Sequence, residues 1–567
     1  MTSDKTVQQL ARKYFPQDFA ITTWEKLQEE LEKLLAYPIG SAEELLEFWQ
    51  TVSELDKIIR DKGAWLYINM TRFADNVEHE QAFNQFVETI EAKRSSYAFK
   101  LKKKFYASPW RTQLAPEYAH LNRIIASEIE LFREENIPLF VKEQELTTQY
   151  GKIVSKMTVL FQGEEKTVQQ LAHYLEDQNR ELREAAWRLM FGRYAQDQVV
   201  LDSLFDELKS LRVQIAKNAG FENYRDYAHQ ANGRFSYTPE DLVRLHTVVE
   251  EMIVPLIEEF NAERKSKLGL DVLKPWDFKV DIDGQLIKPF ATHEDLIAKG
   301  AQTIAQVDPL FGIELEKMRT HEFIDAENRK GKAPGGYCYP LYEAGSSFIF
   351  MHAVGVRQDV EVFVHETGHA MHNRLSKQHP IMQYTSTPSE VAELASMSME
   401  LLSMDHWDNF YAPADLENIR KKELRDKLNV LPWGVVVDAF QHWLYLHPEH
   451  SAEERGKHFA GLLDRFHVGG SWTGLEKEKA MRWMLQLHIF EVPFYYIEYV
   501  LAQLGAIAVY RNYRQNPQKS MEEYKNFLAL GYTKPVAEVY ATAGIAFDFS
   551  KEYVAELMDF MRSELAI

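Results

Sequence analysis

The sequence predicts a mainly α-helical protein folded into two or more lobes, and three observations support this prediction. Apolar residues recur at helical spacing along most of the chain, with charged residues between them. Only three short segments have patterns typical of strands. The chain has 567 residues, which exceeds the size at which a single hydrophobic core stops growing. Hydrophobic residues make up 45 % of it, which is enough for a large core and argues against disorder.

The clearest helical pattern is TWEKLQEELEKLLAY, from Thr23 to Tyr37. Similar patterns fill roughly residues 41–62, 78–105 and 115–135, and another helix is expected at VQQLAHYLEDQ. No repeat of fixed period and no low-complexity segment is visible. We therefore expect residues 1–200 to form an N-terminal helical lobe and residues 201–567 to form a larger lobe that contains the few strands.

Three segments are expected to contain strands. The first is KIVSKMTVLFQ, from Lys152 to Gln162, where β-branched residues are near alternation before a polar turn. The second is DFKVDIDGQLIKPF, in which Asp283-Gly284 is a hairpin turn signal. The third is SSFIFMHAVGV, from Ser346 to Val356. From about Val360 onward the pattern is helical again.

Charge and cysteine content exclude several classes of partner. The formal net charge is −20, so nucleic acid and anionic membrane surfaces are not expected to bind. The single cysteine, Cys338, cannot form an internal disulfide, which fits a reducing compartment. The first residues lack the apolar run of a secretory signal, and no stretch of about 20 apolar residues occurs. We expect a cytoplasmic protein with no membrane partner and no obligatory protein partner.

The segment DVEVFVHETGHAMHNRL carries the most informative motif. It contains His365-Glu366-Thr367-Gly368-His369, which is a HExxH pattern. Residues four apart lie on one face of a helix, so both imidazoles can reach one metal ion. Glu366 then lies beside the ion, where it can take a proton from a metal-activated water. A glycine at 368 costs helix stability, and it could relieve crowding where another backbone packs against the site.

Zinc in a peptidase needs a third protein ligand and an open fourth position. The motif is not followed by the glycine and histidine that a metzincin requires, because positions 372 and 375 are His372 and Leu375. The third ligand should therefore be a carboxylate on a nearby helix.

The segment STPSEVAELASMSMELLSMD supplies three candidate carboxylates. Thr387 suits the N-cap of a helix, and Glu390 would complete a capping box. Glu393 and Glu400 are seven residues apart and share a helical face. We expect Glu393 to be the ligand and Glu400 to accept a hydrogen bond from a ligand histidine. Spacing alone leaves Glu390 and Glu400 open as alternatives.

Seven segments, which follow one another as they do in the family, resemble the thimet oligopeptidase and oligoendopeptidase F family of zinc peptidases. The resemblance is closest to the shorter bacterial members, including the Pz-peptidases. The seven segments span about residues 275–549 and are Pro275-Trp276-Asp277, Gly335-Gly336-Tyr337-Cys338, SSFIFMHAVG, HETGHAMH, PSEVAELASMSMELL, HIFEVPFYYIEYVLAQ and GYTKPVAEVYATAGI. Together they are far more specific than the metal motif alone.

The resemblance implies one Zn²⁺ per chain, with His365, His369 and Glu393 as ligands and Glu366 as general base. It is this resemblance that excludes Glu390 and Glu400 as ligands. It also implies a two-lobed, zincin-type helical peptidase, with residues 201–567 as the catalytic lobe. A small strand region is expected beside the HExxH helix, and a deep channel is expected to admit short unstructured oligopeptides.

The resemblance further implies roles in substrate binding and catalysis for residues outside the metal motif. His488, Tyr496 and Tyr499 match a histidine and tyrosines that contact substrate and the transition state, with Tyr495 nearby. We expect these four residues on one helix after Pro493, although aromatic residues at this spacing are also typical of a core.

Other matched segments suggest how substrate is held. Gly335-Gly336-Tyr337 is expected to form a loop that closes on substrate, with a plain turn as the alternative. The SSFIFMHAVG strand is expected to pair through its edge with the peptide backbone. His352 on this strand would contact substrate or be an ordinary polar edge residue.

We therefore expect a zinc metalloendopeptidase. The alternative is a metallocarboxypeptidase or dipeptidyl-peptidase of related helical HExxH type, which would need basic groups for the substrate's terminal carboxylate. A non-enzymatic zinc-dependent binding protein is a third reading, but Glu366 argues against it because a structural site needs no base.

Overall fold

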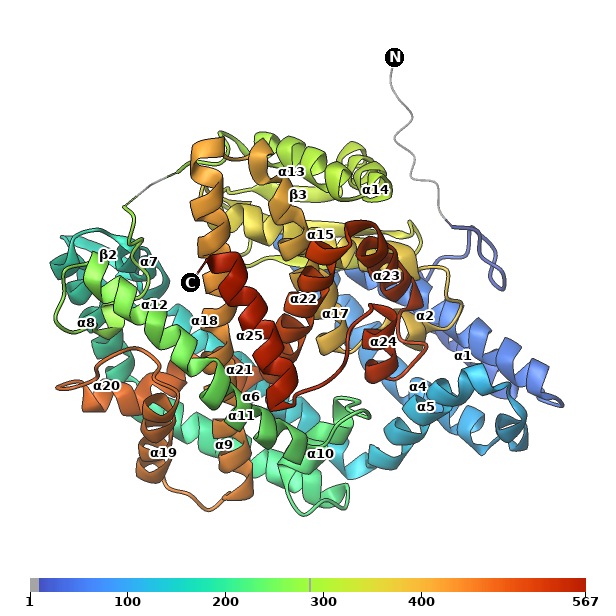
Figure 1. The fold of residues 1–567 in the computed structure, drawn as a ribbon. Coiled ribbons are helices and arrows are strands. Elements are labelled where there is room, and N and C mark those ends of the chain that lie inside the picture. The colour runs from blue at the N-terminus through green and yellow to red at the C-terminus, as the bar shows by residue number, and fades with distance from the viewer. Residues whose placement is uncertain (1–9, 285–286, 567) are drawn as a thin grey trace. The chain divides into compact units, whose positions relative to one another are not determined.

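The computed structural model describes residues 10–284 and 287–566, which form helices joined by short connections together with two small sheets (Figure 1). The prediction of a mainly α-helical fold is confirmed. Among the described residues, no helix combines the length and the apolar character needed to cross a membrane.

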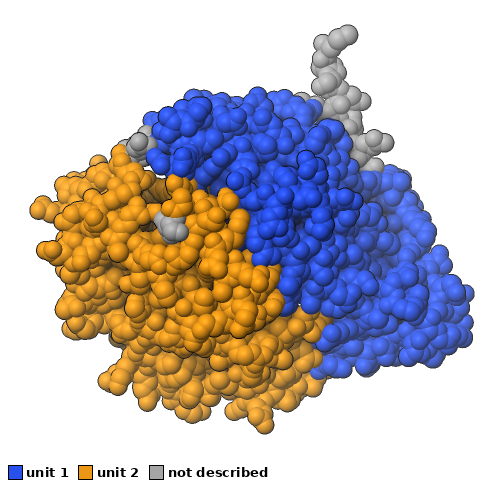
Figure 2. All heavy atoms as spheres, viewed as in Figure 1, with its two compact units in different colours: residues 1–130, 287–420, 505–547 blue, residues 131–286, 421–504, 548–567 orange. Residues whose placement is uncertain are grey.

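The chain divides into two compact units, coloured separately in Figure 2. Unit 1 comprises residues 1–130, 287–420 and 505–547, and unit 2 comprises residues 131–286, 421–504 and 548–567. Each unit is therefore assembled from three separate segments of the chain. The boundary predicted at residue 200 lies inside the helix α9 (Gln198–Asn218) and coincides with no limit of these units.

Unit 1 contains a three-stranded sheet and helices from each of its three chain segments. Its strands are β3 (Ile324–Glu327), β4 (Tyr337–Leu341) and β5 (Ser346–Ala353). Its helices are α1 (Trp24–Ala36), α2 (Ala42–Arg72), α3 (Val77–Phe86), α4 (Ala92–Ala107), α5 (Ala119–Leu131), α13 (His293–Val307), α14 (Pro309–Thr320), α15 (Arg357–Ser376), α16 (Met382–Thr385), α17 (Ser389–Ser403), α23 (Pro517–Leu530) and α24 (Val536–Thr542).

Unit 2 contains a two-stranded hairpin, β1 (Thr158–Phe161) and β2 (Glu164–Thr167), and a further set of helices. These are α6 (Ile137–Ser155), α7 (Val168–Ala172), α8 (Arg180–Gln196), α9, α10 (Tyr224–Ala231), α11 (Pro239–Met252), α12 (Val254–Lys267), α19 (Ala452–Arg465), α20 (Glu476–Met481), α21 (Leu487–Glu491) and α25 (Lys551–Leu565). Two long helices, α18 (Pro413–Leu446) and α22 (Ile497–Gln515), have residues in both units.

The N-terminal helices form where the sequence predicts them, because their starts carry side-chain caps. Thr23 accepts a hydrogen bond from the Lys26 amide before α1, and Ser41 accepts one from the Glu44 amide before α2. The apolar faces of α1, α2, α4 and α5 meet in one core. Its fully buried members include Leu27, Leu45, Phe48, Phe105 and Leu121.

The strand predictions are confirmed at two of the three segments. β5 lies within the third segment, and β1 lies within the first, although α6 extends into that segment as far as Ser155. The second segment contains no strand among its described residues 277–284 and 287–290. There the Asp281 side chain accepts hydrogen bonds from the amides of Asp283 and Gly284, which makes a local turn in place of a hairpin.

The three-stranded sheet has the order β3-β5-β4. β5 pairs in parallel with β3 and antiparallel with β4, where Tyr337 is opposite Phe350 and Leu341 is opposite Ser346. β5 is therefore the central strand: β4 pairs with its residues 346–350 and β3 with its residues 349–353. The outer edges of the sheet belong to β3 and β4, and pairing of the β5 segment with substrate stays a prediction.

A buried ionic cluster on β3 joins the sheet to α2. Asp325 accepts hydrogen bonds from Arg72 at 2.9 Å and from Arg329 at 2.7 and 2.9 Å. The Lys332 ammonium, whose side chain is fully buried, donates to an Asp325 carboxylate oxygen at 2.9 Å and to the carbonyls of Glu327 and Met351. Burial alone would raise the pKa of Asp325, but these three cations hold it well below the usual range.

We predict that Asp325→Asn lowers the free energy of unfolding of unit 1 by about 3–5 kcal/mol, because it leaves the buried Lys332 charge uncompensated. Thermal and denaturant unfolding would measure this loss. Glu29→Gln is the matched control, since Glu29 pairs with Lys33 on the exposed face of α1 and should leave the midpoint unchanged. Equal midpoints for the two variants would contradict the role of the cluster.

Candidate metal centre

A carboxylate cap sets the start of the motif helix. The Asp359 Oδ2 atom accepts hydrogen bonds from the amides of Val354, Gly355 and Val356, at 2.8, 2.7 and 3.0 Å. Gly355 has a φ of +95°, a conformation that side-chain-bearing residues rarely adopt. The turn from β5 into α15 is thereby closed, and HExxH begins two turns further along the helix.

Helix α17 packs directly on α15 at the centre of the motif. A Cβ atom at Gly368 would lie 2.6 Å from Ser396 Cα and 2.9 Å from the Ala395 carbonyl oxygen. The two backbones are therefore in contact, which only glycine on α15 and small residues on α17 allow. The expectation that Gly368 relieves crowding beside the site is confirmed.

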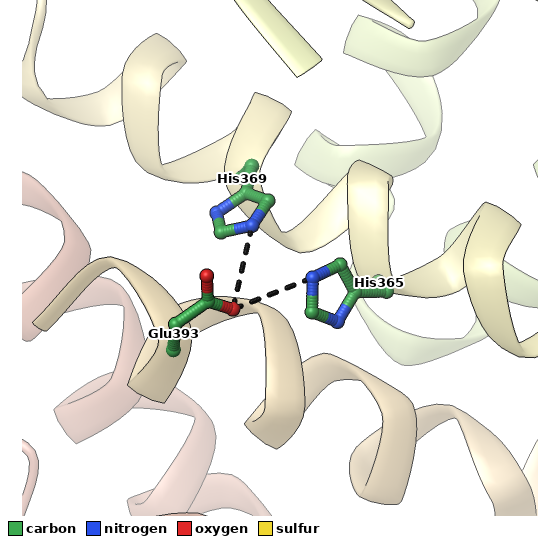
Figure 3. A group of neighbouring side chains, drawn as sticks. All are labelled: His365, His369 and Glu393. Carbon is green, nitrogen blue, oxygen red and sulfur yellow. Dashed lines mark ion pairs between the residues drawn. The ribbon is translucent and has the colours of Figure 1, made fainter. Parts of the chain in front are cut away.

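The contact between these helices brings two imidazoles and one carboxylate together (Figure 3). Glu393 Oε2 lies 3.4 Å from His365 Nε2 and 3.7 Å from His369 Nε2. A tetrahedral zinc site with bonds of about 2.0–2.2 Å separates its donor atoms by about 3.3–3.6 Å. The first distance lies within this range and the second lies just above it, so the nitrogen and oxygen donors present fit a zinc ion.

Two hydrogen bonds orient these side chains. Glu400 Oε1 accepts from His365 Nδ1 at 2.5 Å, which leaves Nε2 of His365 facing Glu393. Ser396 Oγ donates to Glu393 Oε2 at 2.9 Å. Such partners fix the tautomer of a histidine and the rotamer of a carboxylate before a metal binds.

The buried charges act strongly on one another. Burial alone would lower the pKa of His365, but the contact with Glu400 raises it to about 10. Burial lowers the pKa of His369 to about 3 and raises that of Glu366 to about 7. A dication held here would favour neutral imidazoles and ionised carboxylates, so metal binding and proton release are coupled.

Glu366 lies within this cluster without being one of the three donors. It is 8 % exposed, and the charges of His365, Glu393 and Glu400 act on its pKa. The next residue, Thr367, is fully buried and donates its hydroxyl to the Phe363 carbonyl at 2.8 Å. A carboxylate in this position is able to exchange a proton with a small molecule held by the three donors.

The predicted capping role of Glu390 is wrong. α17 begins at Ser389 with Pro388 as its N-cap, and no side chain caps it, so Thr387 lies outside the helix. Glu390 is fully buried in the first turn of α17, and its backbone carbonyl accepts the hydroxyl of Tyr540. Packing against α24 therefore replaces the capping box at this end.

Only the last residue of the predicted substrate loop lies in the sheet, and Gly335 and Gly336 form the bend that precedes it. Tyr337 is the first residue of β4, its ring stacks on Phe350 at 4.7 Å, and its hydroxyl bonds Thr71 at 2.6 Å. Gly335 has a φ of +107°, and a Cβ at Gly336 would lie 3.4 Å from the Phe350 carbonyl oxygen. Tyr337 is therefore held in place, and a role of this segment in binding substrate stays a prediction.

His352 is engaged on both sides of its ring. Nε2 lies 2.7 Å from the Ala333 carbonyl oxygen, and Nδ1 lies 3.2 Å from Asn328 Oδ1. The residue thus ties β5 to the connection between β3 and β4. Cys338 lies on β4, where burial raises the pKa of its thiol well above the usual value. Such a thiol is an inert one.

The aromatic residues predicted to act on substrate gather in unit 2. The His488 ring stands edge-on to Tyr496 at 4.8 Å and lies 6.1 Å from Tyr495 and 6.4 Å from Tyr499. The four side chains therefore form one cluster. Whether they contact substrate stays a prediction.

The expectation that these four residues share one helix is wrong. His488 lies on α21 and Tyr499 on α22, whereas Tyr495 and Tyr496 lie in the turn between them. The break occurs at Pro493, which lacks an amide hydrogen, and at Phe494, whose φ is +65°.

Buried polar side chains hold Phe494 in this unusual conformation. Its amide donates to Gln441 Oε1 at 2.8 Å, and its carbonyl accepts from Arg234. Arg234 also pairs with Glu498 at 2.8 Å, and both residues are buried. The turn that carries Tyr495 and Tyr496 is therefore anchored on both sides.

Glu400 accepts the hydrogen bond from His365 that the sequence predicts, but the other residues that orient the site were not predicted. Ser396 follows Glu393 by three positions, the spacing at which a serine can reach back to a carboxylate one turn earlier. Asp359 is the third residue of α15, a common position for a capping carboxylate, and this pattern was available in the sequence. Gln486 contacts His488, and Trp433 contacts Gln486. No sequence spacing relates position 433 to the other two residues.

Comparison with known proteins places the chain among peptidases. The sequence pattern of Peptidase family M3 matches residues 173–559, which is more than half of the chain. Group B oligopeptidase PepB of Streptococcus agalactiae is 23 % identical over 65 % of this chain and 61 % of that protein. Oligoendopeptidase F, plasmid, of Lactococcus lactis subsp. cremoris is 22 % identical over 93 % of this chain and 90 % of that protein.

Solved structures agree with these sequence matches. Pz peptidase A with inhibitor 2 superimposes with a TM-score of 0.89 at 26 % identity, covering 98 % of this chain and 99 % of that chain. Oligoendopeptidase-F from Enterococcus faecium has a TM-score of 0.63 at 16 % identity, covering 96 % of each chain, and shows the shared fold alone. The resemblance found in the sequence is confirmed.

We predict that Gly368→Ala destabilises the contact between α15 and α17 by about 1–3 kcal/mol, because the added methyl group would overlap Ser396. Thermal unfolding and bound metal per chain would both be measured, and both should fall.

Gly192→Ala is the matched control, since Gly192 lies within α8 with no atom within 4 Å of the added Cβ. This control should be neutral or gain up to about 1 kcal/mol from helix propensity. An equal gain for Gly368→Ala would disprove the close approach.

Proposed function

The chain belongs to peptidase family M3, and we propose that it is a zinc endopeptidase that hydrolyses short, unstructured oligopeptides. The observation that carries the proposal is the group of His365, His369 and Glu393, whose donor atoms lie 3.4 and 3.7 Å apart, close to the spacing in a tetrahedral zinc site. The presence of Glu366 beside this group distinguishes a hydrolytic site from a structural one.

His365 Nε2, His369 Nε2 and Glu393 Oε2 would hold the ion. When bound, zinc supplies Lewis-acid chemistry: it lowers the pKa of water and polarises a peptide carbonyl. Glu400 keeps the Nε2 atom of His365 available by accepting from Nδ1, and Ser396 keeps the Glu393 carboxylate turned toward both histidines.

Glu366 acts as the general base in this proposal. Its carboxylate would accept a proton from the attacking water and then deliver that proton to the amine of the leaving peptide. Burial strengthens its interactions, since the medium around it is poorly polarisable. The carboxylate is held on α15 one position after His365, so its distance from the ligands is set by the helix itself.

Substrate binding is proposed at two places. β4 is an edge strand among the strands that the structure describes, so its backbone is suited to pair with an extended peptide. The cluster of His488, Tyr495, Tyr496 and Tyr499 offers a histidine N–H and phenolic hydroxyls as donors to substrate or to the developing oxyanion. The resemblance to oligoendopeptidases supports this second role.

The composition of the chain and the names of its relatives support a cellular location and a class of substrate. The single cysteine supports the proposed cytoplasmic location, and the net charge of −20 disfavours nucleic acid as a partner. The names of the relatives, oligopeptidase and oligoendopeptidase, support short peptides as substrates.

We predict that Glu393→Ala lowers bound zinc by at least 10-fold, whereas Glu366→Gln retains zinc and loses about 10²–10⁴-fold in turnover. Elemental analysis and peptide cleavage would be measured on the same preparations. A chelator should abolish wild-type cleavage, and added zinc should restore it.

Glu316→Gln is the control, because Glu316 pairs with Arg319 on the exposed face of α14 and should change neither quantity. Unchanged zinc in Glu393→Ala would remove that ligand from the proposal. Full turnover by Glu366→Gln would remove the proposed base.

We also predict that the enzyme cleaves a peptide with an amidated C-terminus as fast as the free acid, within about 3-fold. An endopeptidase does not bind the terminal carboxylate, whereas a carboxypeptidase or dipeptidyl-peptidase must pair it with a basic group. Mass spectrometry of the products would locate the cut bond. Cleavage of the free acid alone would favour the exopeptidase alternative.

A further inference from the structure

We propose that Gln486 and Trp433 are positioning residues that hold His488 as the neutral tautomer with its proton on Nε2. This inference rests on the proposed function, in which His488 donates a hydrogen bond to substrate. It concerns residues that lie outside the metal centre, and all three belong to unit 2.

The orientation of the Gln486 amide follows from its neighbour. Trp433 Nε1 donates to Gln486 Oε1 at 3.1 Å. An indole N–H is a donor and never an acceptor, so the oxygen of the amide, and not its NH₂ group, must face Trp433. The usual ambiguity between the two ends of a glutamine amide is therefore resolved chemically.

The opposite end of the amide then determines the state of the histidine. Gln486 Nε2 lies 2.6 Å from His488 Nδ1. Since the NH₂ group can only donate, Nδ1 must be the unprotonated acceptor of the ring. The proton of a neutral imidazole then resides on Nε2, which becomes a fixed hydrogen-bond donor.

The position of these residues in the fold supports this chain of hydrogen bonds from Trp433 through Gln486 to His488, which we call the relay. Gln486 is the N-cap residue of α21, yet its side chain caps no helical amide and reaches His488 two residues later. Trp433 follows Pro432 inside α18, and the Arg482 guanidinium lies 4.3 Å from its ring. The residues come from α18 and from the start of α21, so tertiary packing is needed to assemble them.

The surroundings of His488 keep the ring neutral. Burial lowers the pKa of His488 to about 4. The ring is edge-on to Tyr496, whose phenol has a pKa raised by burial and therefore stays protonated. A neutral ring with a fixed Nε2–H donates without the cost of reorienting when negative charge develops on substrate.

The first test reads the tautomer directly. Nitrogen-15 NMR of histidine-labelled full-length protein distinguishes protonated from unprotonated ring nitrogens, and the His488→Gln spectrum identifies the signals of His488. We expect protonated Nε2 and unprotonated Nδ1 in the wild-type protein. A proton on Nδ1 would overturn the proposal.

The second test reverses the relay with a variant of almost the same shape. In Gln486→Glu, one carboxylate oxygen still accepts from Trp433, and the other attracts a proton to His488 Nδ1. The tautomer should switch, and kcat should fall about 10²-fold with KM changed by less than about 3-fold, because a donor used in the transition state is lost. Trp433→Phe keeps an aromatic ring but removes the indole donor, so it should give a mixture of both tautomers.

Matched controls separate positioning from folding and from charge. Gln214→Glu makes the same change on the exposed face of α9 and should leave kcat and the His488 signals unchanged. A purely structural role for Gln486 would lower the unfolding temperature of Gln486→Glu while leaving the tautomer as in the wild type, and this result would overturn the proposal.

The outcomes also distinguish this inference from the proposed function. Loss of kcat in His488→Gln together with full kcat in Gln486→Glu would overturn the relay and leave the peptidase assignment standing. Full turnover by Glu366→Gln would overturn the peptidase mechanism, while the wild-type tautomer would still decide whether Gln486 orients His488.

Discussion

The close approach of α15 and α17 is the constraint on which the metal centre depends. The two imidazoles lie on one helix and the carboxylate on the other, so the donor spacing follows from the distance between the two helix axes. Gly368 permits that distance, because any side chain there would overlap the backbone at Ser396. A residue that binds nothing thus determines whether three donors can meet on one ion.

The side chains of the metal centre are oriented by hydrogen bonds from residues that lie on the same two helices. Asp359 closes the turn between β5 and α15, and Glu400 and Ser396 orient a histidine and the carboxylate from within α17. The same principle applies in unit 2, where Arg234 and Gln441 hold the unusual backbone at Phe494. In both places buried polar groups are satisfied by one another, so side-chain orientation costs little when substrate or metal binds.

The comparisons and the geometry support the proposed function in different ways. Membership of peptidase family M3 gives the reaction class, and the structures it resembles share the fold over nearly the whole chain. The geometry adds the roles of particular side chains, which no similarity in name can supply. The Trp433–Gln486–His488 relay is an example, since it follows from which atoms donate and which accept.

The sequence by itself determined the helical fold, the HExxH helix and the pair His365 and His369, because these depend on spacing within one element. It also pointed to Glu393, although spacing left Glu390 and Glu400 open. Only the tertiary structure decided that β5 is a central strand, that Glu390 is buried beside α24, and that the aromatic segment breaks at Phe494. The reason is that each of these features depends on which distant segments pack together, and local periodicity carries no information about that packing.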